Sequence, residues 1–285
     1  MDWETLGAVD PRSLVDARLQ LHWAAQAAAA VGKQLLPGQP DYSEQSFTWD
    51  GQLRALVQGL VPGRRPFRSA IRFADPALLF VDGDGSILRE LSLDGRTLDD
   101  LYEWVREEGE QLSGDSFPKA LERPGEDFPV HPVGSGAPFA VSDPAAFAEV
   151  GRYFANADRA LQAVAAQNPG ASPVRCWPHH FDIATLIGLD KDAHSETARS
   201  IGVGLSPGDG GRAEPYFYVT PWPYPETRDL PPLAGGGIWN TEGWVGAVLE
   251  ASTFAGSASN GGQGRRVAEL LDSAVAACRR LLEGS

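Results

Sequence analysis

Apolar residues at helical spacing predict a first helix from about Arg12 to Lys33. They recur every three or four positions and form one stripe: Leu14, Ala17, Leu21, Ala24, Ala28 and Val31. Asp10 is a suitable N-cap, and Pro11 fits the first helical position, where a backbone N–H is not needed. Gly32 or the later Pro37 is expected to end the helix.

Alternation of apolar and polar residues then predicts a run of short strands. The five segments are Ser46–Asp50, Gln52–Leu60, Phe67–Ala74, Leu78–Val81 and Ile87–Leu93. The turn sequence Asp-Gly-Asp-Gly at 82–85 indicates that the last two segments form a hairpin. Because the connections are too short for helical crossovers, the segments should form an antiparallel meander.

A second helix is expected at about Leu98–Leu112. Its buried side consists of Leu98, Leu101, Val105 and Leu112. Thr97 precedes it and Asp100 follows three residues later, which is the pattern of a capping box. The segment from Ser113 to Pro138 is rich in Pro, Gly and charged residues, and it predicts a connecting loop.

The second half of the chain repeats this order of elements. A helix begins at Asp143-Pro144, and its apolar side consists of Phe147, Val150, Phe154, Ala157, Leu161 and Val164. Strands are expected at about Val174–Ile187, Ala198–Leu205, Glu214–Thr220, Gly236–Trp239 and Val245–Phe254. A last helix is expected at about Gln263–Leu282.

The order of elements predicts an α+β fold, with antiparallel sheets backed by helices in two similar helix–strands–helix halves. Residues 1–112 would form the first half, 113–141 a connecting loop, and 142–285 the second half, all within one compact unit. A doubly wound parallel sheet is disfavoured because the strands do not alternate with helices. No residue-level self-similarity is evident, so a true internal repeat stays an open alternative.

The composition narrows the class of protein and of partner. The 285 residues can bury a large core without a disulfide or a metal ion. The chain has 38 acidic against 24 basic residues, and its net charge of -14 disfavours binding to nucleic acid or anionic membranes. Cys176 and Cys278 are far apart and indicate free thiols in a reducing compartment. The N-terminal segment lacks a signal-peptide pattern, so a cytoplasmic location is expected.

Three short motifs are better explained as turns than as catalytic or binding motifs. The Gly-Leu-Ser-Pro-Gly segment at 204–208 matches a nucleophile elbow, but no helix follows it and no His comes after His194. The Asp-Gly turn at 82–85 lacks the later Gly and acidic residue of a calcium loop. Pro207 replaces the third glycine of a dinucleotide-binding motif.

Strand alternation in the second half places polar and aromatic residues together on one face. If the apolar positions of three neighbouring strands face the core, Gly202 and Gly204 lie on the other face of the sheet. The ligand-binding candidates are His180, Asp182, Ser206, Asp209, Arg212, Glu214, Tyr216, Tyr218 and Trp222. Aromatic walls with a few polar groups are typical of small-molecule sites. The alternative is a face that packs on another element or on a second copy of the chain.

The catalytic candidates on this face are His180, Asp182 and Glu214, with Asp182 or Glu214 as a general base and His180 as its partner. His180 and Asp182, two apart on one strand, are also weak candidates for metal ligands. A third ligand would have to come from Asp209 or Glu214. Because two ligands do not make a site, no metal or other cofactor is predicted.

Five segments resemble the bacterial family described as domain of unknown function 5996. They read ARLQLHWAAQAAAAVGK, LLP, RSAIRFADPALLFVDGDG, HHFDIATLIG and SPGDGGRAEPYFYVTPWPYP, of which the last two are the most distinctive. The family has no assigned activity, so the resemblance implies no catalytic role for Asp182, Asp209 or Glu214. The double His is not a clear part of the family pattern, which argues against a metal site.

Three hypotheses remain open from the sequence. The first is a small-molecule-binding protein with an aromatic and acid-lined cleft, with or without enzymatic activity. The second is a metal-dependent hydrolase that uses His180 and Asp182. The third is a non-enzymatic module for protein interaction or self-association, with a homo-oligomer as one form. The sequence indicates neither a substrate nor a reaction.

Overall fold

The structure is a computed structural model that describes residues 3–125, 127–190, 198–256 and 260–283. The chain divides into two compact units. Unit 1 consists of Met1–Ser13, Arg152–Arg175 and Asp182–Ser285, and unit 2 of Leu14–Gly151 and Cys176–Phe181. The chain therefore passes between the units several times, and the predicted connecting loop at 113–141 lies inside unit 2.

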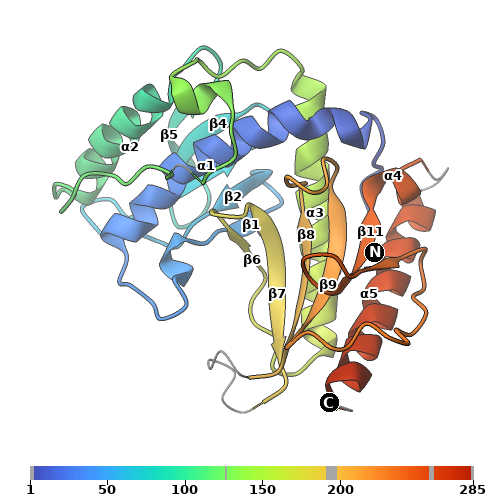
Figure 1. The fold of residues 1–285 in the computed structure, drawn as a ribbon. Coiled ribbons are helices and arrows are strands. Elements are labelled where there is room, and N and C mark those ends of the chain that lie inside the picture. The colour runs from blue at the N-terminus through green and yellow to red at the C-terminus, as the bar shows by residue number, and fades with distance from the viewer. Residues whose placement is uncertain (1–2, 126, 191–197, 257–259, 284–285) are drawn as a thin grey trace. The chain divides into compact units, whose positions relative to one another are not determined.

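Unit 2 contains the predicted meander as a five-stranded antiparallel sheet in the order β1-β2-β3-β4-β5 (Figure 1). The strands are β1 (Thr48–Asp50), β2 (Ala55–Val57), β3 (Arg68–Arg72), β4 (Ala77–Val81) and β5 (Ile87–Ser92). In the β4–β5 turn, Asp82 Oδ1 accepts hydrogen bonds from the backbone N–H groups of Asp84 and Ser86. Gly85 has a φ of 86°, which glycine adopts without steric cost. The hairpin prediction is confirmed.

Two helices of unit 2 form where the apolar periodicity predicts them. Helix α1 (Val15–Leu35) follows a short 3₁₀ turn, η1 (Pro11–Leu14), whose first turn is capped by Asp10 through a 2.9 Å bond from the N–H of Arg12. The predicted stripe of α1 is buried along its length. Helix α2 (Leu98–Ser113) has the predicted capping box, in which Thr97 and Asp100 exchange hydrogen bonds. Two further 3₁₀ turns are η2 (Ser43–Gln45) and η3 (Pro132–Ser135).

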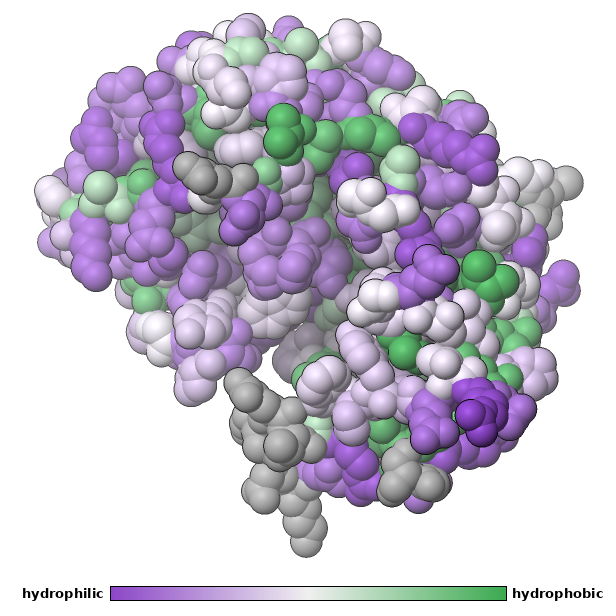
Figure 2. Space-filling model, viewed as in Figure 1, coloured by the Kyte–Doolittle hydropathy of each residue, from purple (hydrophilic) through white to green (hydrophobic). Residues whose placement is uncertain are grey.

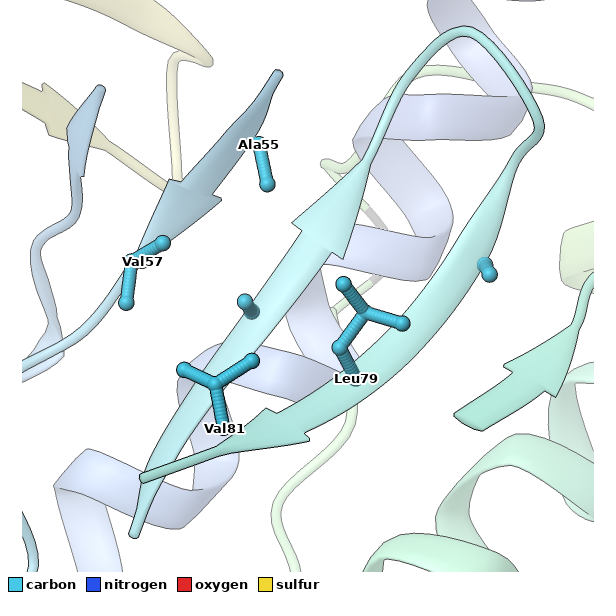
Figure 3. Close-up of a cluster of buried hydrophobic side chains, with 6 residues drawn as sticks. Ala55, Val57, Leu79 and Val81 are labelled. Carbon is cyan, nitrogen blue, oxygen red and sulfur yellow. The ribbon is translucent and has the colours of Figure 1, made fainter. Parts of the chain in front are cut away.

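One face of the sheet in unit 2 carries a cluster of small apolar side chains (Figure 3). Its members come from β2, β3 and β4 and are Ala55, Val57, Ala70, Ala77, Leu79 and Val81. The register places Leu79 opposite Ala70, and Ala70 opposite Val57. A large side chain thus alternates with a small one across the strands, which lets the layer pack densely.

Unit 1 contains a six-stranded sheet in the order β10-β11-β9-β8-β7-β6. The strands are β6 (Arg175–Trp177), β7 (Asp182–Gly188), β8 (Ser200–Ser206), β9 (Tyr216–Trp222), β10 (Ile238–Asn240) and β11 (Gly246–Glu250), and β6 spans the division between the units. The single strand predicted at Val174–Ile187 is wrong, because a turn at 178–181 separates β6 from β7. Pro178 has no N–H to offer a strand ladder, which explains the break.

The helices that belong to unit 1 also follow the predicted pattern. Helix α3 (Pro144–Gln167) begins in unit 2 and ends in unit 1, while α4 (Ala251–Phe254) and α5 (Asn260–Glu283) lie in unit 1. Helix α5 packs against β8, β9 and β11 (Figure 1). The strand predicted to reach Phe254 ends at Glu250, and its last residues form the short helix α4.

The surface agrees with the charged composition. In Figure 2, hydrophilic side chains cover most of the visible face, and the hydrophobic ones are scattered over it. In the described part of the chain, no helix combines the length and the apolar character needed to cross a membrane. Because the two sheets are antiparallel and are accompanied by helices, the fold class is α+β, as the sequence predicts.

Candidate functional site

Strands β7, β8 and β9 are neighbours and carry the polar face that the sequence predicts (Figure 1). Ile183 pairs with Leu205, which pairs with Phe217, and all three are fully buried. The next register position pairs Ser206 with Tyr216. Because successive side chains of a strand point to opposite faces, the polar and small residues share the other face. The adjacency of the three strands and their parity are as predicted.

Two tyrosines of this face donate hydrogen bonds to carboxylates. Tyr218 Oη lies 2.5 Å from Asp182 Oδ2, and Tyr216 Oη lies at the same distance from Asp209 Oδ2. Burial first, and then the bond with Asp209, raise the pKa of Tyr216, so its hydroxyl stays protonated and continues to donate. A Cβ at Gly204 would lie 2.5 Å from Tyr218 Oη, so the glycine lets the tyrosine lie over β8.

The remaining charged candidates are also bound within unit 1. Arg212 donates to Glu250 at 3.2 Å and to Asn240 at 2.9 Å. Glu214 accepts from the backbone N–H of Ser252 at 2.5 Å and from its hydroxyl at 3.0 Å. The Arg12 guanidinium adds a third bond to Glu214, at 3.3 Å.

These contacts tie the loop between β8 and β9 to the sheet. Ser206 Oγ accepts from the N–H of Gly208 at 3.2 Å, and Asp209 Oδ1 accepts from the N–H groups of Gly211 and Arg212. Trp222, at the end of β9, is 45% exposed and packs edge-on against Tyr224. The predicted ligand-binding residues of unit 1 thus mostly bind one another, and their arrangement accounts for the local fold without a ligand.

His180 does not occupy the position that the sequence predicts. It lies in the turn at 178–181 and is exposed, so strand alternation no longer places it on the same face as Asp182. Among the described residues, no group of three or more His, Cys, Asp or Glu side chains gathers closely enough to hold a metal ion. Strand parity therefore does not support a pairing of His180 with Asp182.

A cavity of about 580 Å³ lies within unit 2, and the sequence does not predict it. Four segments line it: the C-terminal half of α1, residues 41–45, residues 122–124, and the end of β6 with its following turn. None of the nine predicted ligand-binding residues is among its lining side chains. Each wall is held in place by its own set of contacts.

Helix α1 forms the floor of the cavity through Ala29 and Ala30. A Cβ at Gly32 would lie 2.1 Å from the carbonyl oxygen of Glu44, so this glycine allows η2 to approach the helix closely. Buried Gln58 fixes the approach, because its amide donates to the carbonyl oxygens of Ala29 and Gln45 and accepts from the N–H of Gly32. This places Tyr42 and Gln45 at the rim.

The turn after β6 brings Trp177 and His179 to the cavity. The carbonyl oxygen of Pro178 lies 2.9 Å from His22 Nε2 and accepts a 2.6 Å hydrogen bond from Gln26. Burial lowers the pKa of His22 to about 4, so the imidazole is neutral near pH 7 and donates through Nε2. Phe181, with a φ of 58°, stacks on His22 at 5.0 Å between ring centroids. The α1 side chains His22 and Gln26 therefore hold the turn.

The last wall is the segment from Glu122 to Pro124. The Tyr102 hydroxyl donates to the carbonyl oxygen of Glu122 at 3.1 Å, and burial raises the pKa of this tyrosine. The Glu122 side chain forms an ion pair with Lys33 of α1. Arg123 pairs with Asp99 and lies 5.0 Å from the centre of the Tyr102 ring. Both cations of the cavity lining are therefore bound to carboxylates.

Comparison with known proteins adds no relative. No family model matches the chain, and neither a curated protein nor a solved structure matches it. The resemblance to the family of unknown function stays a prediction.

Proposed function

We propose that the protein binds a small organic molecule in the cavity of unit 2. The observation that supports this proposal is the cavity itself, whose volume of about 580 Å³ falls in the range of ligand pockets. Its lining combines two alanines of α1, the aromatic side chains of Tyr42 and Trp177, and polar or charged side chains from each of the four segments. The hydrogen bonds that hold each wall favour a cavity that exists before the ligand arrives.

This proposal keeps the hypothesis of a small-molecule-binding protein, but it places the binding site in the cavity of unit 2 instead of on the polar face of unit 1. The polar face of unit 1 is a weaker candidate because its tyrosines, carboxylates and arginine already have hydrogen-bond partners within the unit. Binding there would have to break those bonds, and an unpaired buried polar group costs about 1–3 kcal/mol. The cytoplasmic location and the absence of nucleic-acid partners stay predictions from the sequence.

The experiment is a screen of small molecules by saturation-transfer NMR, repeated on a variant with the cavity filled. Ala30 lies on the floor, so Ala30→Trp should place an indole in the cavity. We expect binders of the natural chain to lose affinity by about tenfold or more, which corresponds to ~1.4 kcal/mol. Ala163→Trp, a change of the same size on helix α3 of unit 1, is the matched control and should leave binding unchanged.

Two outcomes would count against the proposal. One is a screen in which nothing binds the natural chain. The other is a set of ligands that bind the Ala30→Trp variant as tightly as the natural chain, provided that circular dichroism shows both variants to be folded.

A further inference from the structure

We infer that the cavity of unit 2 selects an organic amine in its protonated form. The inference rests on the proposed function and adds the chemical class of the ligand. It follows from a comparison of the polar atoms of the lining that already have a hydrogen-bond or ion-pair partner with those that can still bind a ligand.

The orientation of Gln26 leaves a hydrogen-bond acceptor for the ligand. Its Nε2 lies 2.6 Å from the carbonyl oxygen of Pro178 and 3.1 Å from that of His22. Two carbonyl acceptors on one side fix the NH₂ group there, since an amide oxygen cannot donate. In the described part of the chain, no group donates to Gln26 Oε1, and Gln26 lines the cavity.

A second acceptor belongs to Gln45, in the segment 41–45 of the lining. Its Nε2 donates to the carboxylate of Glu44 at 3.1 Å, which assigns the NH₂ group to that side. Among the described residues, nothing donates to its Oε1. Two residues of the cavity lining, one on α1 and one on η2, thus each have an amide oxygen that can accept a hydrogen bond from a ligand.

The charges of the lining favour the same ligand. Lys33 is paired with Glu122 and Arg123 with Asp99, so an anion would have to compete with a carboxylate for either cation. Asp41, whose Oδ1 accepts a hydrogen bond from the N–H of Ser43, adds a further carboxylate to the lining. The net charge of -14 on the whole chain also raises the local concentration of cations.

The apolar part of the lining suits the body of such a ligand. Trp177 and Tyr42 supply aromatic faces, which attract an ammonium group through the ring quadrupole. Ala29 and Ala30 leave room for a flat ring system on the floor. A ring-bearing amine therefore matches the acceptors, the charge and the shape together.

The test uses three compounds of one shape and different charge: tryptamine, tryptophol and indole-3-acetate. Affinities are measured by NMR titration of the full chain. We expect tryptamine to bind more tightly than the alcohol and the acid by about fivefold or more, and to lose its affinity in Ala30→Trp. Asp41→Asn should weaken tryptamine by about three- to tenfold and change tryptophol by less than about twofold. Asp84→Asn removes the same charge from an exposed turn and should change neither.

The outcomes separate the inference from the proposed function. If the alcohol or the acid binds the cavity as tightly as tryptamine, the inference is overturned while the proposed function stands. Equal weakening of tryptamine by Asp41→Asn and Asp84→Asn also overturns it, because the effect would then be long-range. If none of the three compounds binds, the inference is again overturned, and the screen of neutral, acidic and basic molecules decides the proposed function separately.

Discussion

His22 shows how a single residue depends on its surroundings. It lies in α1 with 4% of its surface exposed, between the rings of Phe128 and Phe181. Its imidazole bonds to the carbonyl oxygen of Pro178, which positions the turn beside the cavity. A charged imidazole in this place would lose its hydration without gaining a carboxylate, which is why burial lowers the pKa.

This burial predicts a loss of stability in acid. The pKa of His22 is 6.5 in the unfolded chain and about 4 in the folded one, so between these pH values the unfolded state binds more protons. The free energy of unfolding should therefore fall as the pH drops from 6.5, by roughly 3 kcal/mol once the pH is below 4. His22→Gln keeps an N–H donor and cannot titrate. Urea unfolding at pH 7 and pH 4.5 should show that the variant loses about 2 kcal/mol less than the natural chain. Parallel losses in the two proteins would contradict the assignment.

Whole elements were more predictable than the residues between them. The periodic stripes of α1, α2 and α3 and the five strands of unit 2 are confirmed because each signal lies within one segment of the sequence. The prediction of one strand at 174–187 was wrong because it relied on the alternation of apolar and polar residues. Pro178 has no backbone N–H to donate to a strand ladder, and the strand breaks there.

The candidate site was only partly predictable, because it depends on contacts between segments that are far apart in the sequence. Strand parity predicts that Tyr216 and Tyr218 share a face, but it cannot show that Asp209 and Asp182 accept hydrogen bonds from their hydroxyl groups. The cavity of unit 2 depends on four segments that meet only in the folded chain. The small residues Ala29, Ala30 and Gly32 are the one local sign that something approaches α1 closely.

At the scale of an element, the capping box of α2 predicts a measurable contribution to stability. Thr97 Oγ1 accepts from the N–H of Asp100 at 3.2 Å, and the Asp100 carboxylate accepts from the N–H of Thr97 at 2.7 Å. Thr97→Ala should lower the free energy of unfolding by about 1 kcal/mol, because one N–H at the helix end loses its partner. Thr241→Ala, at an exposed position outside the helices and strands, should change it by less than about 0.5 kcal/mol in the same urea titration. Equal effects of the two changes would show that the cap does not stabilise the helix.

At the scale of the whole molecule, the N-terminal segment of the chain packs against the first turns of the last helix in unit 1. The N-terminal segment buries Trp3 and Leu6, and the side chain of Gln263 in α5 binds both of them. Gln263 is fully buried and also donates to the carbonyl oxygens of Leu6 and Ala255. One amide therefore joins the start of the chain, the end of α4 and the last helix, and unit 1 cannot be completed from residues 142–285 alone.

Gln263→Ala should consequently release the N-terminal segment. Removal of the amide leaves the backbone N–H and carbonyl oxygen of Leu6 and the indole N–H of Trp3 without this partner, and we expect a loss of roughly 3 kcal/mol or more. Hydrogen exchange should also become faster at Leu6, because the segment would open more readily than the sheet. Gln162→Ala, an exposed position on α3, is the matched control and should leave both quantities nearly unchanged. If Leu6 stays protected in Gln263→Ala, apolar packing of Trp3 and Leu6 alone holds the segment, and the buried amide has no role in joining the N-terminal segment to α5.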